Sequence, residues 1–447
     1  MNTKELFKDY YDAWLNDLKD LLRIPSVLTE FNPKNTEAPF GEGVRASLDY
    51  MLDLARRDGF KAVNVDNYAG FIEWGEGDEI VVILCHLDVV PATGTWTNPP
   101  FDPIIKDEKI YARGSNDDKG PLMSALYAMK ILKDQGFKPN KRIRLIIGTD
   151  EETGSRGLKR YLEVEEQPTL GFSPDADFPL IYAEKGIMSI DIFDKNKCAD
   201  IKHIKSGDVY NVVPDKAFAY LNKDLSKEFN AYLKENNFEG SASKEELYVE
   251  GVRAHGMEPR NGKNAMLRLF NFLSDKIDSN LIKFTSKYLN DSRFKDMNLD
   301  YTHHEMGDLT CNVAVCDINE NGGKLGINLR YPIEWKKEEF LKSFKEAASE
   351  YNLEAVVIND SNPHYISPKS ELVQKLYEAY VEVTHDTENK IMTIGGGTYA
   401  RLLTNAVAFG AALPGRETVA HMVDEYMAIE DLEIACLVYI KSIEKLG

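Results

Sequence analysis

Histidine and carboxylate residues gather in five short segments of this chain. Adjacent acids are usually solvated loop charges, and a single histidine is usually packed or exposed without a role, so no segment indicates a site by itself. Together they supply two histidines and three carboxylates, a set that could hold two divalent ions with one carboxylate shared. The segments are HLD at 86–88, NDDKG at 116–120, DEETG at 150–154, SPDADFP at 173–179 and AHMVDE at 420–425.

Two bound ions would activate a water molecule and polarise a carbonyl group, which is the chemistry of amide hydrolysis. Such a site also needs a general base that is not itself a ligand. The adjacent acids Glu151 and Glu152 are a candidate pair, in which one carboxylate binds metal and its neighbour takes the proton. These residue types therefore indicate metal-assisted hydrolysis.

The first of these segments ends an apolar run, VVILCHLDVVP at 81–91, that is typical of a buried strand. Side chains alternate along a strand, so His86 and Asp88 should project to one side and Cys85 to the other. One interpretation is a core histidine hydrogen-bonded to a neighbouring acid. The other is a metal ligand whose second ring nitrogen is held by the carboxylate.

The elements that would position these residues alternate between apolar strands and amphipathic helices over the first 190 residues or so. This alternation predicts an α/β fold with a doubly wound, mostly parallel sheet, in which sites form beyond the carboxyl ends of the strands. We expect helices over 1–22, 44–60 and 120–137, and strands over 61–67, 70–74, 79–87 and 141–149.

The pattern changes near residue 187. Antiparallel strands with polar alternation are expected at 187–193, 216–222 and 324–332, with a lysine-rich helical stretch at 279–296 between them. A helix at 370–386 and a strand at 406–413 then resume the earlier style. We therefore expect a catalytic domain made of 1–186 and 362–447, and an inserted α+β domain at 187–361.

Composition limits the possible partners. The 447 residues carry a formal charge of −19, so nucleic acid and acidic membrane surfaces are poor candidates. No stretch is apolar enough to span a bilayer, and the start lacks the apolar core of a signal peptide. We expect a cytoplasmic protein whose five cysteines are reduced thiols.

The motifs of this chain occur in an order that resembles the co-catalytic dinuclear zinc peptidases related to aminoacylase and glutamate carboxypeptidase. Within them, the chain is most similar to the bacterial dipeptidase V (PepV-like) branch. The motifs that carry this resemblance are HLDVVP, YARGSNDDKGP, GTDEETGS, SPDADFPLIYAEKG, NVVPD, AHGMEPRNGKNA, GGGTYAR and FGAALPGRETVAH.

The resemblance implies a set of metal ligands, with Asp117 as the bridge between two ions. Asp117 is preferred to Asp118 because the bridging acid of the family directly follows the Asn-like position. The family also holds the next peptide bond cis. By motif, His86 and Asp175 would hold one ion and Glu152 and His421 the other.

The same resemblance implies three catalytic roles. Asp88 would orient His86, and Glu151 would be the general base. The inserted domain would be the family's lid, from which His255 would reach into the cleft and donate to the oxyanion. Without the resemblance, His255 is better interpreted as a loop histidine with no role.

Residues that would bind the carboxylate of a substrate are also implied by motif. Asn211 and Arg330 match the family's carboxylate contacts, although a salt bridge within the lid is an equal alternative for Arg330. Gly397 and Thr398 lie in GGGTYAR, where a glycine turn at a helix N-terminus could present N–H groups to an anion. The same turn fits a dinucleotide fingerprint, but no βαβ unit opens there, so a nicotinamide cofactor is not expected.

We therefore predict a metal-dependent dipeptidase with two divalent ions, zinc first and manganese as the alternative, acting as a monomer on small peptides. An N-acyl-amino-acid deacylase or desuccinylase on the same site is the nearer alternative. A cysteine hydrolase using Cys85 is disfavoured, because strand alternation points Cys85 away from His86. A non-catalytic metal-binding protein would have no need of Glu151.

Overall fold

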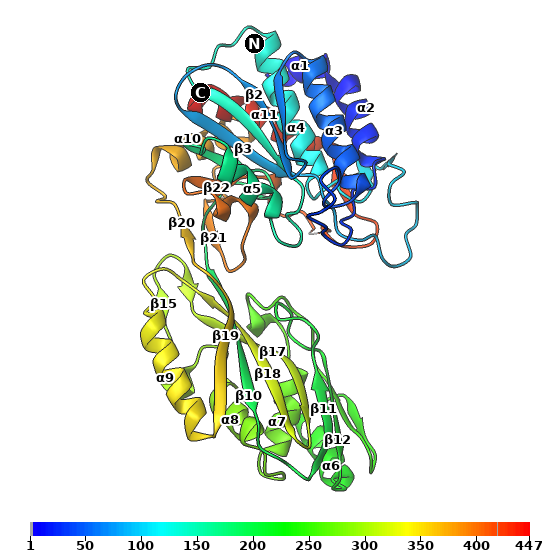
Figure 1. Ribbon diagram of the computed structural model, residues 1–447, viewed down its shortest axis with the longest axis vertical. Coiled ribbons are helices and arrows are strands. Elements are labelled where there is room, and N and C mark those ends of the chain that lie inside the picture. Colours follow the sequence, from blue (N-terminus) through cyan, green and yellow to red (C-terminus); the bar gives the residue numbers. More distant parts are fainter. Residues whose placement is uncertain (1–2, 418) are drawn as a thin grey trace. The chain divides into compact units, whose positions relative to one another are not determined.

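A computed structural model of the chain describes residues 3–417 and 419–447. It contains two compact units (Figure 1). The first consists of the chain up to Tyr182, Ile366–Met392 and Thr398–Gly447, and the second of Ala183–Tyr365 and Thr393–Gly397. The expected domain limits, 186/187 and 361/362, stay a prediction. The segment 393–397 was expected in the catalytic part, but its contacts are with the second unit.

The first unit is built on a mixed sheet whose four central strands are parallel and whose outer strands are antiparallel. This confirms the α/β fold class. The strands, in spatial order, are β1 (Lys61–Val65), β2 (Ala69–Trp74), β6 (Arg142–Gly148), β3 (Ile80–His86), β7 (Leu170–Ser173), β22 (Ala406–Ala408) and β9 (Ile181–Glu184). Two short strands that belong wholly or mostly to the second unit also pair with β9, namely β20 (His364–Tyr365) and β21 (Met392–Ile394).

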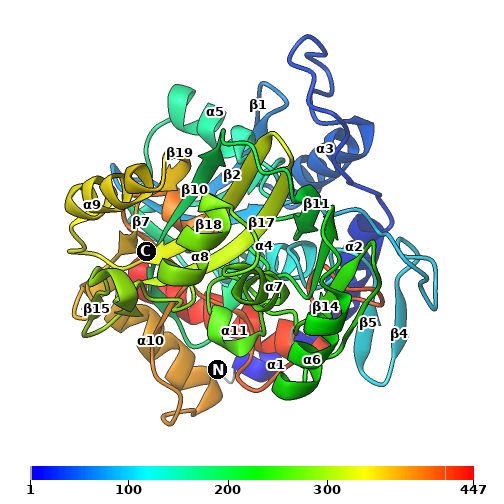
Figure 2. The same ribbon diagram turned by 90° about the horizontal axis from the view of Figure 1, so that it is seen from below.

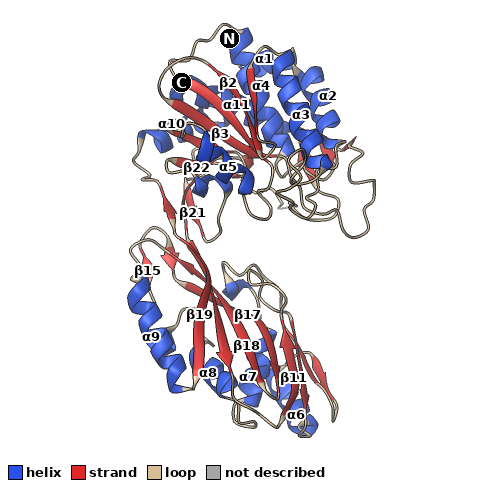
Figure 3. Ribbon diagram, in the orientation of Figure 1, coloured by secondary structure: helices blue, strands red, loops and turns tan. Residues whose placement is uncertain are grey.

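Helices pack around this sheet (Figure 3). The single opening helix expected over 1–22 is two helices, because the N–H of Tyr10 bonds to the carbonyl of Phe7 in a turn. No described helix is both long and apolar enough to cross a membrane. The helices of this unit are α1 (Thr3–Lys8), α2 (Tyr11–Leu22), α3 (Glu42–Arg57), α4 (Lys119–Asp134), α5 (Arg156–Val164), α10 (Glu371–Thr384) and α11 (Ile429–Leu446), with a 3₁₀ helix at Tyr399–Leu402.

Two small sheets complete the first unit. The strand expected over 406–413 is interrupted, because β22 ends at Ala408 and Gly410 turns the chain with a φ of 83° before β23. These sheets bring late segments of the chain to early ones. They comprise β4 (Ile104–Lys106), β5 (Lys109–Tyr111) and β24 (Tyr426–Ala428), and the pair β8 (Ala176–Asp177) and β23 (Ala411–Ala412).

The second unit is an eight-stranded antiparallel sheet with helices, as expected for the inserted domain. In spatial order its strands are β13 (Gly240–Ala242), β14 (Leu247–Glu250), β12 (Lys216–Leu221), β11 (Ile201–Ser206), β17 (Thr310–Asn319), β18 (Gly322–Tyr331), β10 (Gly186–Asp194) and β19 (Leu353–Ser361). Its helices are α6 (Ser226–Asn236), α7 (Ala265–Leu273), α8 (Asn280–Tyr288) and α9 (Lys337–Glu350), with 3₁₀ turns at Pro259–Asn261 and Lys295–Met297 and a short ladder of β15 (Thr302–His303) with β16 (Gly307–Asp308).

The core of the second unit lies between this sheet and its helices. Alternate residues of β10, such as Ile190 and Ile192, share one face and are buried with Phe270 of α7, Phe284 of α8 and Phe344 of α9. Figure 2 shows α7 and α8 lying across this sheet. The helix expected over 279–296 ends early, at the end of α8.

One buried ion pair interrupts the apolar strands of the first unit. Arg144 of β6 lies opposite Glu73 of β2, and its Nε donates to Glu73 Oε2 at 2.7 Å. Arg144 Nη1 donates to the hydroxyl of Tyr161, and Lys61 donates to the second carboxylate oxygen of Glu73. Although burial acts to raise it, these hydrogen bonds hold the pKa of Glu73 below its ordinary value.

We predict that Glu73→Gln destabilises the protein by about 3–5 kcal/mol, because the buried guanidinium of Arg144 loses its counter-charge. A carboxylate whose pKa is lowered by folding stabilises above its ordinary pKa of 4.5, and this contribution is lost as the pH falls through the lowered value. The difference between wild type and variant in urea denaturation should therefore shrink in acid. Glu166→Gln, which removes an exposed partner of Arg142, is the control and should change little.

Candidate metal centre

The polar clusters predicted from the sequence meet at one edge of the first sheet. Strands β3 and β6 are parallel neighbours, and His86 at the end of β3 lies opposite Gly148 at the end of β6. Strand β7 ends at Ser173, two residues before Asp175. The expectation that these side chains gather at the carboxyl ends of parallel strands is confirmed.

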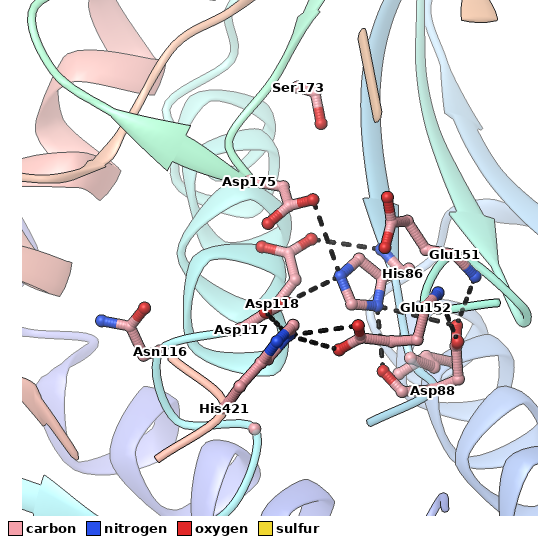
Figure 4. A network of polar contacts seen from close by, with 12 residues as sticks. His86, Asp88, Asn116, Asp117, Asp118, Glu151, Glu152, Ser173, Asp175 and His421 are labelled. Atoms are coloured by element: carbon pink, nitrogen blue, oxygen red, sulfur yellow. Dashed lines mark hydrogen bonds and ion pairs between the residues drawn. The ribbon is translucent and has the colours of Figure 1, made fainter. Parts of the chain in front are cut away.

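Asp117 lies between two imidazole rings. Its Oδ1 is 2.9 Å from Nε2 of His86, and its Oδ2 is 2.9 Å from Nε2 of His421. Figure 4 shows both contacts as dashed lines. Each carboxylate oxygen thus faces a different histidine, which is the arrangement that a bridging ligand requires.

Two groups of ligand atoms surround Asp117. In one, His86, Glu151 and Asp175 each offer an atom within 4.8 Å of the others. In the other, Glu152 and His421 join Asp117 itself, with His421 Nε2 at 3.1 Å from Glu152 Oε2. The five residues expected as ligands are therefore together, and Glu151 lies with the first group.

The chemistry of these atoms fits divalent cations. His86 Nε2 and Asp117 Oδ1 are buried and lie 2.9 Å apart, and neither has the geometry of a hydrogen bond with any described residue. Burial and the charge of Asp117 raise the pKa of Asp175 well above its ordinary value. Asp117 and Glu152 raise the pKa of His421 to about 10. A pocket that favours added positive charge, lined by imidazole and carboxylate and lacking thiolate, suits zinc or manganese.

Asp88 contacts His86 differently from the expectation. The Nδ1–H of His86 donates to the backbone carbonyl of Asp88 at 2.9 Å, whereas the nearer carboxylate oxygen is 3.6 Å away. The carboxylate instead accepts the backbone N–H groups of Glu151 at 3.0 Å and Glu152 at 3.1 Å. Strand β3 ends before Asp88, so strand alternation does not decide where this side chain points.

Asp118, the neighbour of Asp117, contacts the backbone of His86 and not its ring. Asp118 accepts the backbone N–H of His86 through Oδ2 at 3.1 Å, and burial raises its pKa to about 8. The Asp117–Asp118 peptide bond is cis, as the family resemblance implied.

Glu151 has the environment of a proton acceptor. Burial raises its pKa to about 7, the charge of His86 opposes this, and Glu152 and Asp117 add to it. A carboxyl group with a pKa near neutrality suits proton transfer at neutral pH.

Cys85 does not have the environment of a nucleophile. It is fully buried, and burial raises the pKa of its thiol well above the ordinary value. All five cysteines are buried, free thiols. A thiolate nucleophile needs the opposite shift.

The candidate residues of the second unit also lie near one another. The N–H of Gly256 bonds to the carbonyl of Asn211, beside His255. Burial and the charge of Arg330 lower the pKa of His255, and its Nδ1 accepts the N–H of Met257. The neutral ring therefore carries its proton on Nε2, which is free to act as a donor.

Arg330 is buried on β18. Its Nε donates to Asn328 at 2.9 Å and its Nη1 to the carbonyl of Gly395 at 3.1 Å. The helix expected after the glycine turn is only the 3₁₀ segment Tyr399–Leu402, so Gly397 and Thr398 do not open an α-helix. The role of Gly397 and Thr398 in binding a substrate carboxylate stays a prediction.

Two residues near the ligands were missed by the sequence analysis. Tyr399 is buried with its ring edge-on to His86, 6.0 Å between centroids. Its hydroxyl would be 2.0 Å from a Cβ at position 148, which explains the glycine there. Glu425 is fully buried and accepts backbone N–H groups next to Asp117. The only signal for Glu425 was its place in AHMVDE.

We predict that Asp88→Asn weakens metal binding about 10–100-fold, because the amide that replaces one oxygen cannot accept the N–H of Glu151 or Glu152. Calorimetric titration of the metal-stripped protein with zinc measures this. The ring of His86 should stay in place, since the backbone carbonyl of residue 88 holds it. Unchanged zinc affinity in Asp88→Asn would contradict the role of the Asp88 carboxylate in holding the backbone of Glu151 and Glu152.

Known proteins resemble this chain over its whole length. "Putative dipeptidase SSP1012" of Staphylococcus saprophyticus is 42% identical over 465 residues, which cover 99% of each chain. "Putative dipeptidase MW1694" of Staphylococcus aureus is 41% identical, again over 99% of each chain. Among solved structures, human carnosine dipeptidase 1 has a TM-score of 0.61 at 14% identity, covering 99% of this chain and 98% of that one. This last likeness shows the shared fold.

A family profile gives the most direct assignment. The profile of the peptidase family M20/M25/M40 matches residues 82–445, a range that contains every residue of the candidate metal centre described above. With this match and the full-length relatives, the chain belongs to the peptidase family M20/M25/M40.

Proposed function

We propose that this protein is a metal-dependent dipeptidase of the dipeptidase V branch, hydrolysing the peptide bond of dipeptides with a free carboxylate. The observation that carries the proposal is Asp117, which faces His86 with one oxygen and His421 with the other. The names of the full-length relatives support the choice of dipeptides as substrates.

We assign the ligands that the family resemblance implies. His86 and Asp175 would hold one divalent ion, Glu152 and His421 the other, and Asp117 both. When bound, two such ions supply an activated water and a polarised carbonyl. Zinc is the first candidate and manganese the second.

Glu151 is assigned as the general base. Its carboxylate takes a proton from the attacking water and gives it to the departing amine. Its backbone N–H is held by Asp88, which restrains the position of the residue next to the ligand Glu152.

The second unit is proposed to supply the groups that contact the rest of the substrate. His255, neutral and with Nε2–H as a donor, would stabilise the developing oxyanion. Arg330 and Asn211 would bind the substrate carboxylate, with the backbone at Gly397 and Thr398. A cytoplasmic location and a monomeric state stay predictions.

The first test is hydrolysis of a dipeptide panel by metal-stripped protein, with zinc or manganese added back. We expect no turnover without metal and recovery with one of the two ions, because the proposed reaction needs a metal to activate the water and polarise the carbonyl. N-acetyl and N-succinyl amino acids are run alongside. Turnover of these but not of dipeptides would favour the deacylase or desuccinylase instead.

A second test separates catalysis from metal binding. Glu151→Gln keeps the size of the side chain but removes the proton acceptor, so kcat for a dipeptide should fall about 10²–10⁴-fold. Metal content, measured by mass spectrometry, should stay that of wild type. An active Glu151→Gln protein would exclude Glu151 as the base, and a fully metal-loaded wild type inert towards every substrate would favour a non-catalytic metal-binding protein.

A further inference from the structure

The carboxylate of Glu425 accepts several hydrogen bonds from the loop that carries Asp117. Its Oε1 accepts the backbone N–H of Asn116 at 2.9 Å and that of Asp117 at 3.2 Å. The N–H of Gly114 is 3.1 Å from both oxygens, and Arg113 Nη1 donates to Oε2 at 2.6 Å. Glu425 has no exposed surface.

A short ladder places Glu425 at this loop. Strand β24 pairs with β5, with Tyr426 opposite Tyr111, and the N–H of Ala112 bonds to the carbonyl of Glu425. The ladder therefore brings Glu425 to the residues that follow β5. These residues lead directly into the loop that carries Asp117.

The same segment carries a ligand. His421 lies four residues before Glu425 and contacts the second oxygen of Asp117. The segment 421–425 thus touches the side chain of Asp117 through His421 and its backbone through Glu425. Because His421 and Glu425 are only four residues apart, the short segment between them limits how far these two contacts can move relative to each other.

A structural ion pair alone does not account for this arrangement. The pairing of Glu425 with Arg113 uses one carboxylate oxygen, and Arg113 also lies over the ring of Trp96, 5.0 Å from its centroid. The backbone N–H groups of Asn116 and Asp117 converge on the other oxygen. Such groups beside a ligand fix its orientation and raise its affinity for the ion.

We propose that Glu425 is a positioning residue that holds the backbone of Asp117, so that its two carboxylate oxygens face His86 and His421, the residues that would hold the two metal ions. Glu425 is not a ligand. This inference rests on the proposed metal centre and deepens it, because it names the group that makes the bridge rigid.

The experiment is calorimetric titration of the metal-stripped, full-length protein with zinc alone. Glu425→Gln leaves one acceptor oxygen but places an amide N–H₂ against the guanidinium of Arg113 or against backbone N–H groups. We expect zinc affinity to fall about 10–100-fold. The manganese form should lose the electron-paramagnetic coupling between two bridged ions, a signature that a purely structural role would not change.

A neighbouring acid provides the matched control. Asp424 accepts the N–H and hydroxyl of Thr97 at the surface, away from the backbone N–H groups that Glu425 holds. Asp424→Asn should bind zinc as wild type does.

The outcomes distinguish a Glu425 that positions Asp117 for metal binding from a Glu425 that only stabilises the fold. Glu425→Gln with the zinc affinity of Asp424→Asn, or a loss of apo-protein stability with unchanged zinc affinity, would overturn the proposal. If Glu425→Gln does not fold, Glu425→Asp, which keeps the charge but is one methylene shorter, should still lose about tenfold in affinity. Wild type that binds two zinc ions but cleaves no dipeptide would refute the proposed function and leave this inference standing.

Discussion

Five acidic side chains lie close together around two imidazole rings, and the repulsion between their negative charges is the constraint on which the site in the first unit depends. Burial and neighbouring charges raise the pKa of Asp175 and Glu151, while His421 is driven towards its charged form. The repulsion within such a group of acids is relieved either by protonation or by nearby positive charge. The apolar strands behind the cluster supply rigidity, and divalent cations would supply the charge. The acids are Asp117, Asp118, Glu151, Glu152 and Asp175.

Three carboxylates that are not assigned as ligands hold the segments that carry the ligands. Asp118 accepts the backbone N–H of His86, and Asp88 accepts those of Glu151 and Glu152. Glu425 accepts that of Asp117. Each of these contacts fixes the main chain, which leaves the ligand side chains free to bind metal. The positions of the ligands therefore depend on hydrogen bonds that no ligand motif contains.

The second unit has a different chemical character. It is an antiparallel sheet with a large apolar core, and its polar candidates, His255 and Arg330, are a neutral donor and a guanidinium. These groups suit the recognition of oxygen anions, whereas the first unit favours cations. In the proposed function, the candidate hydrolytic groups belong to the first unit and the candidate anion-recognising groups to the second.

The sequence by itself determined the α/β class and the antiparallel character of the inserted part, because hydrophobic period is a local property. The family resemblance of its motifs named five candidate ligands, which the fold brings together. It did not reveal that the carbonyl of Asp88, and not its carboxylate, holds His86, or that Glu425 meets the loop of Asp117. The contact between Asp88 and His86 joins residues only two positions apart and depends on where β3 ends, at His86. Glu425 and Asp117 are 308 positions apart, and the pairing of β24 with β5 brings them together. Tertiary structure decided them because a backbone N–H has no identity in the sequence, and its partner is known only when the chain is folded.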